Sequence, residues 1–222
     1  MIKVIVVLKR RADLCVERFQ AYWRDHHAPL VARLPGLRRY VQSHTLESGY
    51  RKREPAADGI AELWFDGLAA LKALAGTPEL AAVLADEAHF IAEQSQTLTG
   101  EHVIKEGAMP AGGLKNIEFV KKRADMTVAD FQHYWRTVHG PLGASIPTVQ
   151  RYVQCHTQAG AYARATAPAY DGFALTWFAD LEAMRESARS PQYAATRADE
   201  DNFLSVPLAF IITREHVVVN GS

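Results

Sequence analysis

Two histidines, His27 and His139, hold the same place in two closely similar stretches of this 222-residue chain. Residues 19–30 read FQAYWRDHHAPL, and residues 131–142 read FQHYWRTVHGPL. Because an imidazole titrates near neutral pH, a histidine at the end of a cavity could act as a general base. The alternative is a buried histidine that hydrogen-bonds to the backbone and locks a helix against a sheet. Both histidines are therefore candidate catalytic residues.

A second repeated set of polar residues follows in each copy. The set is a tyrosine, a glutamine and a histidine at alternate positions: Tyr40, Gln42 and His44 in the first copy, and Tyr152, Gln154 and His156 in the second. Side chains alternate across a strand, so each set shares one face. Helices bury an apolar face, so we expect these rows on the opposite face, around an enclosed polar cavity. The histidines are then catalytic candidates, and the tyrosines and glutamines are candidates for substrate binding.

Two further aromatic pairs recur in both copies. Tyr50 and Tyr162 align in the loop after the polar strand, where a tyrosine could donate a proton or hold an enolate-like oxygen. The alternative is that each tyrosine only packs as a lid. Trp64 and Trp177 align on a later strand and complete the predicted substrate-binding set.

Two carboxylates occur in one copy only. Glu62 is matched by Leu175 in the second copy, and Glu118 is matched by Val6 in the first. If these side chains point inward, burial raises the pKa of each carboxyl and makes it a candidate base. If they lie at a solvated strand end, they have no catalytic role. The two halves of any active cavity are therefore not equivalent.

The elements that position these residues repeat with a period near 112 residues. Lys9–Leu46 and Lys121–Gln158 share 21 identities in 38 ungapped pairs. Residues 16–31 are predicted to form a helix, which Pro29 kinks or ends. The predicted strands are residues 2–8, 37–45, 60–65 and 101–105, with counterparts at 114–120, 149–157, 173–178 and 214–219. The predicted alanine-rich helices are residues 67–75 and 80–93, with counterparts at 181–187 and 193–203.

Each copy thus reads β-α-β-β-α-β, the ferredoxin-like order. The predicted domains are residues 1–108 and 113–222, joined by a short linker at 107–113. Two such sheets can close face to face and hide their edges. We expect an α+β chain in which two ferredoxin-like βαββαβ repeats pack sheet to sheet as an intramolecular dimeric α+β barrel. The sequence does not decide whether two such chains form a homodimer.

The composition narrows the range of partners. Net charge is zero and the pI is about 7.1, so the basic footprint of a nucleic-acid-binding protein is missing. The apolar start of the chain is too short for a membrane span and lacks a signal-peptide cleavage site. The two cysteines, Cys15 and Cys155, do not align, so we predict a reducing cytoplasmic location. We predict no metal and no cofactor, because adjacent histidines on a helix diverge and no phosphate-binding loop occurs.

The motif order resembles the EthD family of the dimeric α+β barrel superfamily. The strings YWRDHHAPL, LPGLRRYVQSH, DGIAELWF and EHVI carry the resemblance, and YWRTVHGPL, RYVQCH, DGFALTWF and EHVV repeat it. The resemblance implies small, often cofactor-free proteins, including cyclases, dehydratases, isomerases and hydrolases of aromatic catabolism. More distant barrels bind haem or consume oxygen. The family's motif histidine corresponds to His27 and His139.

We therefore predict a cofactor-independent acid/base enzyme, an isomerase or a lyase of cyclase or dehydratase type. Its substrate would be a small oxygenated aromatic or unsaturated carbonyl compound bound in the barrel. Such chemistry needs only a placed acid, base and hydrogen-bond donors. The alternatives are an esterase of an aromatic ring-cleavage product, a haem-linked or cofactor-free oxygenase, and a non-enzymatic ligand-binding or stress-associated protein.

Overall fold

The computed structural model describes residues 1–107, 111–163 and 165–221. The middle of the predicted linker, residues 108–110, lies outside the described part. The chain divides into two compact units. The first comprises Met1–Leu98 with the last residues from Glu215, and the second comprises Thr99–Arg214. The long strands β4 (Ile91–Lys105) and β8 (Ala209–Val219) contribute residues to both units.

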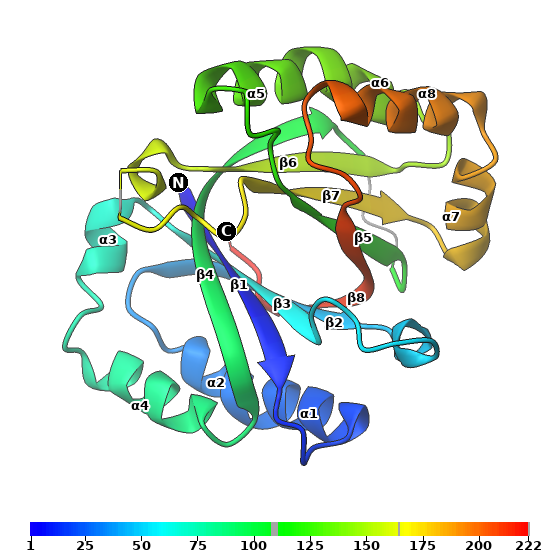
Figure 1. Ribbon diagram of the computed structural model, residues 1–222. Coiled ribbons are helices and arrows are strands. Elements are labelled where there is room, and N and C mark those ends of the chain that lie inside the picture. Colours follow the sequence, from blue (N-terminus) through cyan, green and yellow to red (C-terminus); the bar gives the residue numbers. More distant parts are fainter. Residues whose placement is uncertain (108–110, 164, 222) are drawn as a thin grey trace. The chain divides into compact units, whose positions relative to one another are not determined.

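The first unit is a sheet with helices on one face (Figure 1). Its strands are ordered β4-β1-β3-β2-β8. Its own elements are β1 (Ile2–Arg10), α1 (Val16–Tyr22), the π-helix η1 (Trp23–His27), α2 (Ala28–Val31), β2 (Leu37–Thr45), the 3₁₀ turn η2 (Glu47–Tyr50), β3 (Gly59–Phe65), α3 (Leu68–Lys72) and α4 (Pro78–Glu87). Both β1 and β2 pair antiparallel with β3, which places Ile5 and Val41 opposite Glu62.

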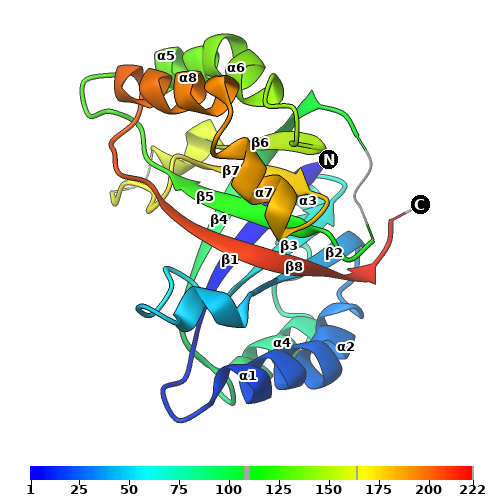
Figure 2. The ribbon, with the colours of Figure 1, turned by 90° about the vertical axis from the view of Figure 1, so that its right-hand side faces the viewer.

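The second unit repeats this order, and its helices α5, α6 and α8 lie together on one face of its sheet (Figure 2). Its strands are ordered β8-β5-β7-β6-β4. Its own elements are β5 (Leu114–Val120), α5 (Val128–Tyr134), the π-helix η3 (Trp135–His139), α6 (Gly140–Ala144), β6 (Arg151–Thr157), the 3₁₀ turn η4 (Ala159–Ala161), β7 (Gly172–Phe178), α7 (Leu181–Ser187), α8 (Pro191–Asp199) and the 3₁₀ turn η5 (Glu200–Asn202). The predicted α+β class with two ferredoxin-like repeats is confirmed.

The ends of both repeats differ from the prediction. Strand β4 begins at Ile91 rather than at Glu101, and β8 begins at Ala209 rather than at Arg214. The helices before them end correspondingly early, at Glu87 and Asp199. The early part of β4 reads IAEQSQ and is largely solvent-exposed, so its sequence lacks the apolar alternation that identifies a strand. Pairing to neighbouring strands, rather than local pattern, defines these two elements.

The predicted single helix at residues 16–31 is interrupted by a π-turn. The amide of Ala28 donates to the carbonyl of Trp23, five residues back, and Gly140 repeats this bond to Trp135. Pro29, and Pro141 in the second unit, cannot donate the next helical hydrogen bond. The widened turn accommodates that missing donor. Single π-turns within helices are frequent at functional sites.

Each unit has its own apolar core beneath its helices. In the first unit, Phe19 and Trp23 pack with Tyr40, Phe65 and Phe90, all of them almost fully buried. Phe131, Trp135, Tyr152 and Phe203 have the corresponding places in the second unit. The helix-to-sheet space therefore contains the same aromatic residues in both units.

Candidate active site

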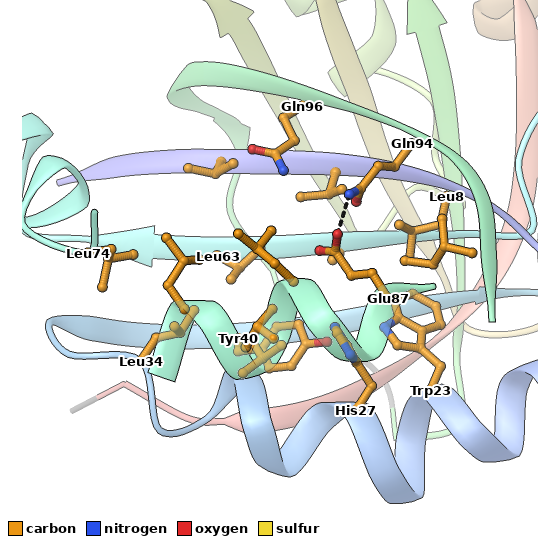
Figure 3. A pocket seen from close by; sticks show the side chains of 18 of the residues that line it. Leu8, Trp23, His27, Leu34, Tyr40, Leu63, Leu74, Glu87, Gln94 and Gln96 are labelled. Atoms are coloured by element: carbon orange, nitrogen blue, oxygen red, sulfur yellow. Dashed lines mark hydrogen bonds between the residues drawn. The ribbon is translucent and has the colours of Figure 1, made fainter. Parts of the chain in front are cut away.

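The first unit holds a cavity of about 110 Å³ between its helices and its sheet (Figure 3). Side chains from β1, β2, β3, β4 and from η1, α2, α3 and α4 line it, and most of them are aliphatic. Apart from the Trp23 indole, the lining side chains that can hydrogen-bond are His27, Tyr40, Glu87, Gln94 and Gln96. A concave, mostly apolar site with a few polar groups is typical of small-molecule binding.

His27 lies in this cavity and forms a dyad with Asp86. Its Nδ1 lies 2.8 Å from Oδ2 of Asp86, a residue of α4. The hydroxyl of Tyr22 donates to the other carboxylate oxygen at 2.7 Å. The His27 ring also packs on Phe90, with centroids 4.8 Å apart. Three elements, α1, η1 and α4, thus hold one imidazole in a fixed orientation.

Electrostatics makes this histidine a neutral base. Burial lowers the pKa of His27 below its ordinary value, although the Asp86 carboxylate opposes that shift. Burial would raise the pKa of Asp86, but hydrogen bonds from Tyr22 and His27 outweigh it, and the net effect lowers that pKa. An ionised carboxylate can only accept, so Nδ1 of His27 carries the proton and Nε2 has a free lone pair. Within the described residues, Nε2 forms no hydrogen bond.

The predicted row of Tyr40, Gln42 and His44 shares one face, but it is the face beneath the helices. Gln42 donates from Nε2 to the backbone oxygen of Trp23 at 2.9 Å and to the Tyr40 hydroxyl at 2.8 Å. The predicted outward orientation was wrong because the π-turn places a polar carbonyl in the helix–sheet space, and Gln42 binds it. Tyr40 lines the cavity, whereas Gln42 supports it from behind.

His44 and His156 do not line either cavity described here. The His44 ring stacks on Trp23 with centroids 4.5 Å apart, and His156 stacks on Trp135 at 4.4 Å. Each Nε2 lies within hydrogen-bond distance of the neighbouring glutamine, 2.9 Å from Gln42 Oε1 in the first unit. Burial lowers the pKa of each histidine to about 3. Both rings are neutral packing groups, so their predicted place in the substrate cavity was wrong.

The predicted loop tyrosines are held by carboxylates rather than facing a cavity. The hydroxyl of Tyr50 donates to Asp58 at 2.7 Å, and that of Tyr162 donates to Asp171 at 2.8 Å. Burial, reinforced by the aspartate, raises the pKa of both phenols well above the ordinary value. A tyrosine in this state is a poor acid, and the arrangement fastens the loop to the strand end.

Glu62 lies outside the cavity of the first unit. It is almost fully buried and pairs with Lys3, whose Nζ lies 2.6 Å from its Oε2. Trp64 lies near this pair, with the Lys3 ammonium 4.5 Å from its ring centroid. In the second unit the Lys115 ammonium lies 4.8 Å from the Trp177 ring. Neither tryptophan lines either cavity, so their predicted role in binding has no support from these cavities.

The second unit has a smaller and more polar cavity of about 60 Å³. His139 lines it and is 2.9 Å from Asp199, so the dyad is repeated. Glu118 also lines it, and Arg197 lies between Glu118, at 3.4 Å, and Glu200, at 2.7 Å. Burial, together with the charge of Glu118, raises the pKa of Glu200 to about 7. Glu118 and Arg197 occupy the positions that correspond to Val6 and Leu84 in the first unit.

Corresponding positions explain the difference between the two cavities. The aliphatic residues Leu63, Leu74 and Val83 line the first, where the second has the polar residues Thr176, Ser187 and Thr196. Charged and polar side chains thus replace much of the apolar space in the second unit. The first cavity is the better candidate for an organic ligand.

Sequence reasoning missed Asp86, Asp199 and Glu87. A signal existed, because residues 85–90 read ADEAHF and residues 198–203 read ADEDNF. These stretches are 113 residues apart rather than 112, so a single ungapped offset does not align them. Within an alanine-rich helix, a repeated acidic pair also looks like an ordinary solvated face.

The cavity does not fit a haem group. At about 110 Å³ it is smaller than an apolar cavity of about 150 Å³ that holds a single benzene. A porphyrin has four pyrrole rings and needs far more space. Within the described residues, no group of three or more His, Cys, Asp or Glu side chains is arranged to hold a metal ion. Among those same residues, no helix is long and apolar enough to cross a membrane.

Comparison with known protein families identifies one domain that occurs twice in the chain. The EthD domain model matches residues 11–94 and again residues 123–207. The chain therefore belongs to the EthD family, and carries the domain twice. No curated protein sequence matches it.

Several solved structures share the fold along nearly the whole chain. An anthrone oxidase-like protein has 9% identity and a TM-score of 0.66, over 99% of this chain and 94% of the other. A protein named as a monooxygenase from Fusobacterium nucleatum has 6% identity and a TM-score of 0.60, over 99% and 94%. A mutant chlorite dismutase from Candidatus Nitrospira defluvii has 11% identity and a TM-score of 0.53, over 96% and 91%. At such low identities the likeness concerns the fold alone.

Proposed function

We propose that the first unit is a cofactor-independent acid/base enzyme acting on a small oxygenated aromatic or unsaturated carbonyl compound. The observation that carries this proposal is the neutral, Asp86-oriented imidazole of His27 at an apolar cavity. A base in an apolar site needs no metal to abstract an activated proton, provided that its partner stabilises the resulting imidazolium. Asp86 supplies that stabilisation.

The geometry supports a two-step proton transfer. Nε2 of His27 takes a proton from a carbon next to a carbonyl and becomes an imidazolium held by Asp86. The pair of electrons from the broken bond moves onto the substrate oxygen as an enolate. Tyr40 accepts a hydrogen bond from Gln42, so its own hydroxyl can donate a hydrogen bond to that oxygen while keeping its proton. His27 then returns the proton to another carbon, giving isomerisation, or to a departing hydroxyl, giving dehydration.

The cavity's composition argues against the esterase alternative. Within the described residues, none of the lining side chains is a serine, threonine or cysteine, so no aliphatic alcohol or thiol nucleophile lies beside His27. Hydrolysis would therefore have to use water alone in a largely aliphatic space. Proton transfer within the bound substrate fits these surroundings better.

A second candidate shares the first step. Proteins of this fold include those named as monooxygenases and as anthrone oxidase-like. A substrate carbanion formed by His27 could react with dissolved oxygen in an apolar cavity. This outcome would appear as oxygen consumption that depends on His27.

Matched substitutions in the two units test the proposal. His27→Asn keeps a donor toward Asp86 but removes the Nε2 base, so turnover of an active phenolic or carbonyl compound should fall about 10²- to 10⁴-fold. His139→Asn should leave turnover nearly unchanged. Circular dichroism checks that both variants fold, and oxygen uptake separates oxygenation from isomerisation. Equal activity of His27→Asn and the unmodified protein would contradict the proposal.

A further inference from the structure

One end of the first cavity is polar, and the remainder is not. Glu87 is the last residue of α4, and Gln94 and Gln96 extend from the early part of β4. Figure 3 shows all three on the side of the cavity toward β4, with His27 and Tyr40 on the helix side. The two glutamines are exposed and Glu87 is half-buried, so these residues mark the mouth. A ligand that enters here meets the carboxyl group first.

Glu87 is held in place but is not fully occupied. Gln94 donates from Nε2 to Oε2 of Glu87 at 2.6 Å. Within the described residues, Oε1 of Glu87 forms no hydrogen bond. Burial, with a further contribution from the Asp86 charge, raises the pKa of Glu87, while the Gln94 bond opposes the shift. The carboxyl group therefore retains one oxygen that can bind a hydroxyl.

Among the residues that the structure describes, no positively charged side chain lines the cavity beside this carboxyl group. The lining residues include neither lysine nor arginine. A carboxylate-bearing ligand would bring a second negative charge into an apolar space, which is costly without a cation. An uncharged ligand avoids that cost.

The volume limits the ligand to about one ring. A cavity of about 110 Å³ is somewhat smaller than the apolar cavity of about 150 Å³ that admits benzene. A single six-membered ring is therefore the largest group that the space between helices and sheet can take, and its substituents would extend toward the mouth. Fused polycyclic compounds are too large for this space.

The second unit offers an internal comparison. Glu200 takes the position of Glu87, but Arg197 lies 2.7 Å from it. Leu84 stands at the Arg197 position in the first unit, so Glu87 has no such cation. Arg197 thus balances the charge of Glu200 in the second unit, whereas the carboxyl group of Glu87 in the first unit is left for a ligand.

Building on the proposed function, we propose that Glu87 determines specificity by binding the hydroxyl group of an uncharged, single-ring phenol or enol. The ring lies among Leu8, Leu63 and the other aliphatic side chains, and the hydroxyl donates to Oε1 of Glu87. Gln94 fixes the carboxyl group, and Gln96 flanks the same opening. Ring-cleavage products that carry carboxylates are excluded by the same charge.

Binding of phenol, toluene and benzoate to the full chain tests this assignment, measured by calorimetry. Phenol should bind about tenfold more tightly than toluene, because one hydrogen bond to a charged group distinguishes them. Benzoate should bind at least tenfold more weakly than phenol. Glu87→Leu should bring phenol and toluene within about twofold of each other. Glu87→Gln should bring benzoate closer to phenol, and Glu200→Gln should leave all ratios unchanged.

Several outcomes would overturn the assignment. These are benzoate binding as tightly as phenol, a phenol preference that survives in Glu87→Leu, or no binding of either neutral ring. These binding ratios do not depend on turnover. If His27→Asn retains full activity while the ratios follow Glu87, the acid/base mechanism fails and the specificity assignment stands.

Discussion

Gln42 donates a hydrogen bond from its Nε2 to the backbone oxygen of Trp23, at 2.9 Å, and Gln154 does the same to Trp135 at 2.8 Å. Each bond joins the second strand of a repeat to the π-turn that carries the motif histidine. The same amide reaches the neighbouring tyrosine hydroxyl, so one side chain positions the turn and the tyrosine together. The glutamine thus links strand, turn and cavity wall in both units.

Replacing this glutamine should destabilise the protein. Gln42→Leu leaves the Trp23 carbonyl and the Tyr40 hydroxyl each with one partner fewer, in a fully buried place. We expect a loss of about 1–3 kcal/mol in the free energy of unfolding, measured by urea denaturation. Gln20→Leu is a control, because Gln20 also donates to a backbone oxygen but is only partly buried. An equal or smaller loss for Gln42→Leu than for Gln20→Leu would contradict this account.

The sequence was sufficient to predict the fold class, because the repeat and the periodicity of apolar residues can both be read directly from it. The alternation of Tyr40, Gln42 and His44 correctly placed them on one face. It could not decide which face, because that depends on a carbonyl exposed by the π-turn under the helices. The general expectation of an apolar face beneath helices therefore led to the wrong side.

The dyad partner could not be predicted for a different reason. His27 and Asp86 are 59 residues apart and meet only when α4 packs beside η1. Nothing in the local pattern of α4 distinguishes Asp86 from a solvated carboxylate. Glu62, which stood out as a carboxylate on an apolar strand, instead pairs with Lys3.

Replacing Asp86 should impair His27 as a base, although the imidazole itself remains. In Asp86→Asn the amide can donate to Nδ1 of His27, which forces the proton onto Nε2 and leaves no lone pair toward the substrate. We expect kcat to fall about a thousandfold, with a smaller effect on KM. Asp199→Asn, the matched change in the second unit, should leave kcat within about twofold. A comparable loss in both variants would show that the two dyads act together.

Acid should destabilise the fold through His44 and His156. Their pKa of about 3 in the folded state lies below the value near 6.5 expected when unfolded, so folding favours the neutral form. The stabilisation is complete above pH 6.5 and is lost as pH falls from 6.5 toward 3. Between pH 7 and pH 5, protonation of each histidine should lower the free energy of unfolding by about 2 kcal/mol.

Denaturation curves at pH 7 and pH 5 measure this effect. His44→Phe keeps a ring stacked on Trp23 and removes the titrating group, so the pH 5 penalty should shrink by about 2 kcal/mol. His133→Gln changes an exposed histidine and should leave the difference between the two pH values unaltered. If His44→Phe shows the full penalty, protonation elsewhere governs acid unfolding.

A glycine at the start of β3 fixes how closely the motif tryptophan approaches the sheet. A Cβ atom added at Gly59 would lie 2.3 Å from Cζ3 of Trp23, and one at Gly172 would lie 2.5 Å from the same atom of Trp135. Trp23 is buried and stacked on His44, so it cannot move aside without disturbing η1. Gly59→Ala should therefore cost about 1–3 kcal/mol by overpacking.

Displacing Trp23 would also shift His27, because both residues belong to the π-turn η1. Gly59→Ala should thus lower kcat as well as stability, whereas Gly172→Ala should lower stability alone. Gly100→Ala is the control, since a Cβ there meets no atom within 4 Å. Thermal unfolding and turnover of the same phenolic substrate measure both effects. If Gly59→Ala keeps the stability of Gly100→Ala, the tryptophan has room to move, and the motif does not fix the position of the base.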